Sequence, residues 1–234
     1  MAKLDTDNEV LEKVQGFWSK YSKMITYVGG AVILIAAGWI FYQNSLETKN
    51  TNASEAVFLA EGLFDKMAST GFNKDSVNLV LNGGVSDGAA VTGVLKVMNN
   101  FSGTPTANRA KYIAGACYLQ IKEFDKAIKF LKDFDGGNAA QVKSKALMML
   151  GHAYAEKKQV SEAMNAYESA ATVNEKDESI TPDALMVCAN YAEFNNKNTE
   201  AISFLKKLKE NFPNYVAVSS GDVAKHLARL GELE

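Results

Sequence analysis

The 234-residue sequence is poor in proline, in cysteine and in net charge. It contains 3 prolines and 2 cysteines, and its formal net charge at pH 7 is −2. Few prolines together with many Ala, Leu, Lys and Glu residues favour helix over sheet. A nucleic-acid-binding protein would carry a strong basic excess, whereas the lysines here are interspersed with acids along helix-like segments. We therefore expect no nucleic-acid partner.

The two cysteines, Cys117 and Cys188, lie in different copies of the repeat described below. Both have apolar neighbours, in "AGACYL" and "LMVCAN", where cysteine behaves as a small buried hydrophobe. We predict that the two thiols are unpaired. A disulfide formed in an oxidising compartment remains the alternative.

Patterns that would indicate catalysis or metal binding are also missing. His152 and His226 are the only histidines, and neither has Cys, Asp or Glu residues at metal-ligand spacing. On its predicted helix, His226 has Lys225 and Arg229 as neighbours rather than carboxylates, so no nucleophile, base and orienting group can be assembled. We predict a protein without catalytic residues and without a metal ion or cofactor.

The segment Gly136–Ser144 ("GGNAAQVKS") ends in Lys143 and Ser144, as a phosphate-binding loop ends in lysine and serine or threonine. Val142 stands where that motif needs its second glycine, and no apolar strand precedes the segment. We interpret it as a loop between repeats.

One segment, Met24–Tyr42 ("MITYVGGAVILIAAGWIFY"), contains no Asp, Glu, Lys or Arg. As a helix its length is roughly 28 Å, close to the ~30 Å thickness of a bilayer's hydrocarbon core. A buried core helix would show more polar residues, and a cleaved signal peptide would have a shorter apolar run and small residues at its cleavage site. We predict a retained transmembrane helix at residues 24–43, with the lipid bilayer as a partner.

Lysines flank this segment unequally. Lys3, Lys13, Lys20 and Lys23 precede it, and only Lys49 follows it closely. The positive-inside rule then predicts a cytoplasmic tail at residues 1–23 and translocation of the remainder. Within the span, small residues would permit close packing against another helix; they are Gly29, Gly30, Ala37 and Gly38.

A repeat is the most informative feature of the remaining sequence. Residues 112–134 align with residues 147–170 at a constant offset of 36, and a third copy follows at residues 185–213, with Ala201 38 positions after Ala163. The first two copies match at four positions: Gly115 and Gly151, Tyr118 and Tyr154, Ala127 and Ala163, Leu131 and Tyr167.

Each copy is typical of two antiparallel helices whose small residues let the backbones approach, with large side chains beside them. Thr104–Pro105 and Thr181–Pro182 are predicted helix starts, with threonine as the N-cap. The third copy has Ala189 in place of glycine and Tyr191 one place early, so we expect its turn to differ by one residue.

The flanking segments complete the predicted organisation. Residues 44–104 are expected to form a linker helix, amphipathic over Ser54–Ala68, and an irregular first hairpin with a helix around Ala89–Asn100. Residues 105–218 would form three helical hairpins, and residues 219–234 a C-terminal capping helix. Ser219 or Ser220 would begin that helix and Gly231 would end it.

The repeat resembles the tetratricopeptide repeat, most closely in the second copy, where the matching residues are Leu150, Gly151, Tyr154, Ala163, Tyr167 and Ala170. The predicted fold is all-α, with a single N-terminal transmembrane helix followed by a tetratricopeptide-repeat α-solenoid. The resemblance implies that the first helix of each pair lines a concave groove that suits a peptide or a partner helix. The residues assigned to that groove are Arg109, Tyr112, Lys145, Met148, His152, Met186 and Asn190.

Anchor and repeats together resemble the YfgM-type ancillary subunits of the Sec translocon, most strongly at Gly103–Ile128, which is similar to relatives of the Bacteroidetes kind. This resemblance implies the bacterial inner membrane, an N-terminus in the cytoplasm and a periplasmic domain. It implies as partners the SecYEG channel, a membrane-anchored periplasmic prolyl isomerase and chaperone, and emerging secreted proteins. The alternative is a structural scaffold that organises an outer-membrane, cell-wall or export machine.

Overall fold

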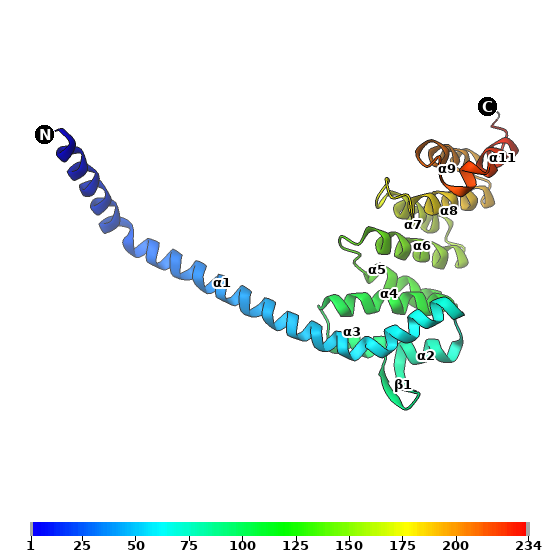
Figure 1. Ribbon diagram of the computed structural model, residues 1–234, viewed down its shortest axis with the longest axis horizontal. Helices are drawn as coiled ribbons and strands as arrows, with labels where there is room; N and C mark the ends of the chain where they lie inside the picture. The colour runs from blue at the N-terminus through cyan, green and yellow to red at the C-terminus, as the bar shows by residue number, and fades with distance from the viewer. Residues whose placement is uncertain (1, 233–234) are drawn as a thin grey trace. The chain divides into compact units, whose positions relative to one another are not determined.

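The computed structural model describes residues 2–232, and it describes side chains from residue 14 onward. Lys3 and Lys13, used above to predict orientation, lie outside the described side chains, and residues 233–234 of the predicted capping segment lie outside the described residues. The chain divides into two compact units, Met1–Lys49 and Asn50–Glu234. Helix α1 (Ala2–Thr70) contributes to both (Figure 1).

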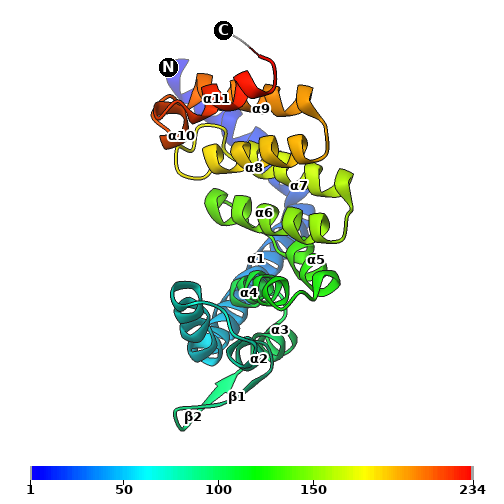
Figure 2. The ribbon, with the colours of Figure 1, turned by 90° about the vertical axis from the view of Figure 1, so that its right-hand side faces the viewer.

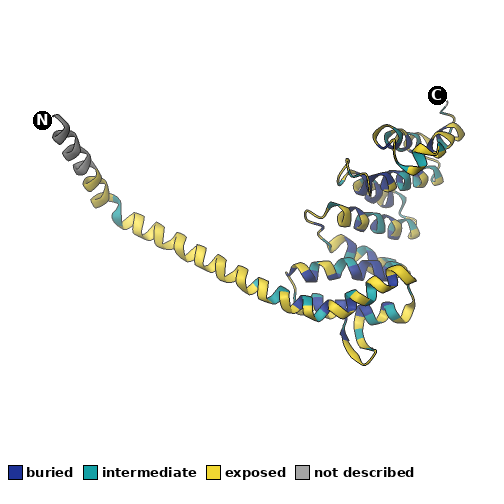
Figure 3. Ribbon diagram, in the orientation of Figure 1, coloured by how far each residue is buried: buried dark blue, intermediate teal, exposed yellow. Residues whose placement is uncertain are grey.

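The apolar segment lies within α1, which is long and apolar enough to cross a membrane and is a candidate anchor. Residues 23–45 are exposed along the helix, unlike the buried faces of the second unit (Figure 3). The predicted helices at residues 24–43 and 54–68 are sections of this one helix. Between Trp39 and Glu61 the sequence contains neither glycine nor proline, so nothing interrupts the backbone hydrogen bonds.

The second unit is a stack of helical hairpins that follows the end of α1 (Figure 2). Three antiparallel pairs, α4/α5, α6/α7 and α8/α9, form its main part, and as far as residue 232 the unit is all-α apart from one short β-hairpin. Its elements are α2 (Lys74–Asn82), β1 (Gly83–Ser86), β2 (Ala89–Thr92), α3 (Val94–Asn100), α4 (Pro105–Gln120), α5 (Phe124–Asp133), α6 (Ala140–Glu156), α7 (Val160–Thr172), α8 (Thr181–Phe194), α9 (Asn198–Asn211), α10 (Val216–Ser219) and α11 (Asp222–Arg229).

The β-hairpin corrects the helix predicted around Ala89–Asn100, because residues 89–92 pair antiparallel with β1 and the helix begins only at Val94. Asp87 and Gly88 both have positive φ, as a two-residue hairpin turn requires. At the base, a Cβ on Gly83 would lie 2.5 Å from the Val91 carbonyl oxygen, so glycine is needed there. The Asp-Gly dipeptide was the sequence signal for this turn.

The turn inside each helical pair has the same geometry. Lys122, Lys158 and Asn196 adopt left-handed conformations with φ of 64°, 59° and 59°. The amide after each of them donates to a carbonyl five residues earlier, as Gln159 does to Tyr154 at 3.0 Å. The expectation that the third turn differs by one residue is therefore wrong. The offset from the second copy is 38 on both sides of that turn, so the two extra residues lie in the loop before α8.

One of the predicted helix caps is present and two are not. The Thr104 side chain accepts from the Ala107 amide at 3.1 Å and caps α4. Thr181 instead lies inside α8 and donates to the Asn174 carbonyl at 2.7 Å, while Asp177 accepts from the amides before the helix. α11 starts after Gly221 rather than at Ser219 or Ser220, since Ser219 is the last residue of α10 and Ser220 is its C-cap.

Close packing of each pair depends on the predicted small residues. A Cβ at Gly115 would lie 2.6 Å from Leu131 Cγ, and one at Gly151 would meet the ring of Tyr167. Ala189 and Leu205 hold the corresponding positions in the third pair and are fully buried. Two main hydrophobic clusters result, one from α1 to α6 and one around α7 to α11.

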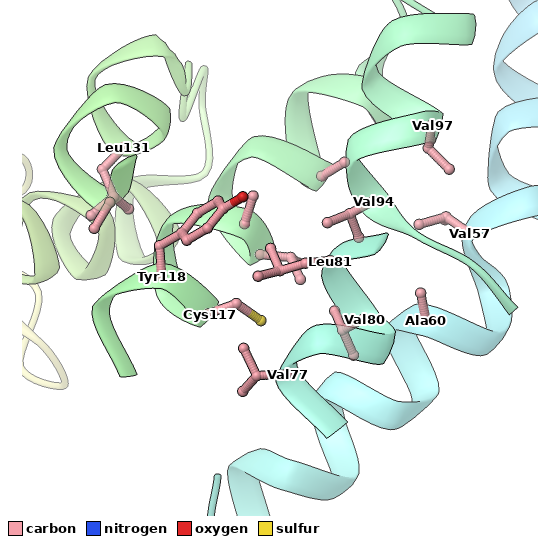
Figure 4. Packing of buried hydrophobic residues seen from close by; sticks show 14 of the residues in the cluster. Val57, Ala60, Val77, Val80, Leu81, Val94, Val97, Cys117, Tyr118 and Leu131 are labelled. Carbon is pink, nitrogen blue, oxygen red and sulfur yellow. The ribbon is translucent and has the colours of Figure 1, made fainter. Parts of the chain in front are cut away.

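Figure 4 shows how α1 joins the first cluster, with Val57 facing Val94 and Val97 of α3 and Ala60 near Val80 of α2. Cys117 lies in this cluster and Cys188 in the second. Both thiols are free and buried, as predicted. Burial raises the pKa of each thiol to about 12.

Candidate functional site

The first helices of the three pairs, α4, α6 and α8, lie above one another in the stack (Figure 2). Residues at offsets of 36 and 38 occupy corresponding positions on them. We use the term first-helix face for the side of these helices that carries the seven predicted residues, which are Arg109, Tyr112, Lys145, Met148, His152, Met186 and Asn190. The stacking brings their three helices together as predicted. Whether these residues bind a partner stays a prediction.

The middle of the first-helix face is formed by α6. Lys145, Met148 and His152 recur at intervals of three and four residues and share one side of the helix. Lys145 and His152 are exposed and Met148 is half-buried. Within the described part of the chain, no acid forms an ion pair with Lys145, so its charge is available to a ligand.

His152 is held in place by the second helix of its own pair. Its Nδ1 lies 2.8 Å from the Tyr167 hydroxyl, and the two rings meet edge to face at 5.3 Å. Desolvation lowers the pKa of His152, and the Glu156 carboxylate opposes that effect. Desolvation by burial also raises the pKa of Tyr167, so the hydroxyl stays protonated. A neutral imidazole that accepts from Tyr167 at Nδ1 carries its proton on Nε2 and presents a donor there.

On α4, two predicted residues are engaged within the chain. Arg109 forms a two-point ion pair with Glu61 of α1, at 2.5 Å from Nε to Oε1 and 3.0 Å from Nη2 to Oε2. Tyr112 is half-buried with its ring 5.5 Å from that of Phe134, and burial raises its pKa. The Arg109 charge is neutralised, so this end of the face cannot serve as a strong anion site.

On α8, Met186 is half-buried against the second cluster and Asn190 is exposed. The sequence reasoning missed Asp183, which occupies the position equivalent to Lys145 and accepts from the Tyr215 hydroxyl at 2.7 Å. The offset of 38 was the signal that would have found it. Charge along the face therefore changes sign, from an available lysine on α6 to a carboxylate on α8.

Tyr112, Met148 and Met186 hold equivalent positions and form a half-buried apolar row flanked by polar and charged side chains. Such a row suits the apolar side of a peptide or helix, because methionine adapts its shape to its neighbours. Cavities occur elsewhere, including one of about 620 Å³ between α9 and α11. That the first-helix face binds a macromolecule rather than a small molecule stays a prediction.

His226 corrects another expectation from the sequence. Its Nε2 lies 2.5 Å from Oε2 of Glu193 on α8, and Arg229 Nη2 lies 2.9 Å from the same oxygen. The pKa of Glu193 is below its usual value, mainly because its carboxylate shares a hydrogen bond with His226. This contact docks α11 onto α8. Among the residues that the structure describes, no group of three His, Cys, Asp or Glu side chains could hold a metal ion.

Comparison with known proteins identifies one segment of the solenoid. The family model of the tetratricopeptide repeat matches residues 144–177, which include most of α6, all of α7 and the first part of the loop toward α8. No curated protein matches the chain. The matched segment carries Lys145, Met148 and His152. A tetratricopeptide repeat is a protein-interaction module, so the chain contains at least one such module.

Proposed function

We propose that this tetratricopeptide-repeat chain is a non-enzymatic, membrane-tethered binding module that receives secreted proteins at the periplasmic exit of the Sec translocon. The observation that carries the proposal is the first-helix face, with its apolar row and free Lys145, on a chain that also has a candidate membrane anchor. The resemblance to YfgM-type subunits supplies the proposed location. It also supplies the proposed partners, which are SecYEG and a membrane-anchored periplasmic prolyl isomerase and chaperone.

Tethering gives this arrangement a physical advantage. An anchor confines the solenoid near the membrane, which raises its effective concentration toward chains that emerge there. Weak contacts to Met148, Met186 and the donor groups of Lys145 and His152 are then sufficient to hold an emerging chain briefly. Rapid release is required of a protein that receives many clients.

The test is site-specific photo-crosslinking of the full-length protein in intact cells. A photoreactive side chain at Met148 should capture Sec channel subunits, the chaperone or secreted proteins. The matched control carries the same group at Asn165, which is exposed on the second helix of the same pair. Equal crosslinking from both positions, or none to these partners from Met148, contradicts the proposal.

The second candidate is a structural envelope scaffold. The alternation of charge between Lys145 and Asp183 favours it, because opposite charges on one face permit self-association of two copies. In the same experiment, crosslinks from Met148 to a second copy or to cell-wall enzymes, without Sec subunits, would support the scaffold.

A further inference from the structure

Four large side chains, three exposed and one of intermediate exposure, form a stripe on α1 ahead of the apolar span. Val14, Phe17, Trp18 and Tyr21 recur at intervals of three and four residues and share one side of the helix. Val14, Phe17 and Trp18 are 57–59% exposed, and the Phe17 and Tyr21 rings lie 4.9 Å apart. A stripe of this size is unfavourable in water and calls for a partner surface.

The other sides of the same section are polar and positively charged. They carry Gln15, Gly16, Ser19, Lys20, Ser22 and Lys23, and no Asp or Glu occurs between residues 14 and 46. Lys20 Nζ lies 5.4 Å from the centroid of the Tyr21 ring. Tryptophan, tyrosine and lysine are the side chains that favour the headgroup level of a bilayer, where each has an apolar and a polar end.

The helix also changes direction at this point. α1 bends in its blue section (Figure 1), where Figure 3 shows residues of intermediate exposure, which are Tyr21 and Ser22. On either side, Ser19 Oγ donates to the Gly16 carbonyl at 3.0 Å and Thr26 Oγ1 donates to the Ser22 carbonyl at 2.8 Å. Such side-chain bonds to the helix backbone are associated with bending.

We infer that residues 14–23 are a membrane-surface helix that binds the anionic headgroup layer next to the span. The inference rests on the proposed membrane anchoring. Val14, Phe17, Trp18 and Tyr21 enter the interface, and Lys20 and Lys23 bind lipid phosphates. The apolar stripe runs directly into the span at Met24, so both contact the same bilayer.

A bilayer fits this stripe better than a second copy of the chain. The adjacent residues Phe17 and Trp18 make the stripe wider than the narrow seam of a two-helix coiled coil. Lys20 and Lys23 would repel their counterparts in a parallel pair of helices, whereas anionic lipids attract them. Each lysine raises the affinity for an anionic membrane surface about five-fold.

The two tryptophans allow a direct test, because Trp18 lies in the stripe and Trp39 lies in the span. The full-length Trp39→Phe protein, in vesicles of phosphatidylcholine with phosphatidylglycerol, reports Trp18 alone. We expect lipids brominated near the headgroup to quench most of its emission and aqueous acrylamide to quench little. The Trp18→Phe protein reports Trp39 and shows independently whether the span is inserted.

The charge requirement is tested in the Trp39→Phe background. Lys20→Gln with Lys23→Gln should weaken the association of residues 14–23 with the membrane surface about 25-fold, so acrylamide should quench Trp18 more strongly. Vesicles of pure phosphatidylcholine should increase acrylamide quenching of Trp18 without these two substitutions. Gln15→Ser, on the same polar side but without a charge to remove, is the matched control and should change nothing.

Three results would overturn the inference. If acrylamide quenches Trp18 in every vesicle while brominated lipid quenches Trp39, the span is inserted but residues 14–23 do not bind the membrane surface. If acrylamide protection of Trp18 follows the protein-to-lipid ratio rather than the phosphatidylglycerol content, a second copy covers the stripe. If lipid quenches neither tryptophan, the anchoring fails as well.

Discussion

Gly151 and Tyr167 set the distance between the two helices of the second pair. The glycine leaves room for the aromatic ring, whereas the third pair has Ala189 and Leu205 at the equivalent positions. A rigid ring has few ways to move away from an added methyl group. The same fold therefore accepts two combinations of small and large residues.

Gly151→Ala should destabilise the protein by about 1–3 kcal/mol from overpacking, reduced by the better helix propensity of alanine. In a Tyr167→Leu background, which copies the third pair, the cost of the alanine should fall by at least about 1 kcal/mol. Urea unfolding of the full chain in detergent, followed by circular dichroism, measures both values. Equal costs in the two backgrounds would show that Tyr167 does not set the spacing.

The buried thiols lead to a second prediction at the residue scale. Because burial raises the pKa of Cys117 and Cys188 to about 12, almost no thiolate exists at pH 8 in the folded protein. A thiol reagent should label both residues slowly in the native protein and rapidly in urea. Rapid labelling of either residue without denaturant would mean that its cluster opens easily.

At the scale of the element, the left-handed residues in the three turns carry a measurable strain. Lys158 has a φ of 59°, which costs a residue with a side chain about 1–2 kcal/mol. Lys158→Gly should therefore stabilise the protein by about 1 kcal/mol, and Asn196→Gly by less, because asparagine tolerates this conformation. Gln159→Gly, at a φ of −86°, should give no stabilisation. Thermal unfolding distinguishes the three variants.

Docking of α11 should depend on pH through Glu193. Its pKa is lowered in the folded state, so the stabilisation is complete above the unfolded-state value of about 4.3 and is lost as the pH falls through the folded-state pKa. Amide hydrogen exchange at neutral pH should be faster in α11 of Glu193→Gln than in the parent protein.

The matched control for that measurement is Asp222→Asn, since the side-chain hydrogen bonds of Asp222 are with Lys225 of α11 and Ser220 just before it. The Asp222→Asn variant should leave the amide exchange rates of α11 closer to those of the parent protein. If Glu193→Gln leaves exchange in α11 unchanged, the apolar contacts of Val223 and Leu227 hold the helix without the ion pair.

At the scale of the whole molecule, the candidate anchor leads to a prediction about the location of the solenoid. The full-length protein should resist alkaline carbonate extraction, because its charge-free segment is long enough to cross a bilayer. A protease added to spheroplasts should digest the part that follows Lys49 without lysis. Digestion only after lysis would reverse the predicted orientation, and extraction by carbonate would exclude an integral anchor.

The sequence by itself determined the features that follow from local patterns. The charge-free run at residues 24–42, the offset of 36 and the pairing of Gly151 with Tyr167 each depend on spacing along the chain, and periodicity records that directly. The Thr104 cap was found for the same reason, because its hydrogen bond reaches only three residues ahead.

The tertiary structure alone decided contacts between distant residues. Glu61 neutralises Arg109 across 48 positions, and Glu193 reaches His226 across 33, although the local sequence gave His226 only basic neighbours. The place of Thr181 inside α8 was likewise set by the preceding loop. The energies of such contacts depend on how helices stack, and stacking is a property of the assembled hairpins that no local spacing encodes.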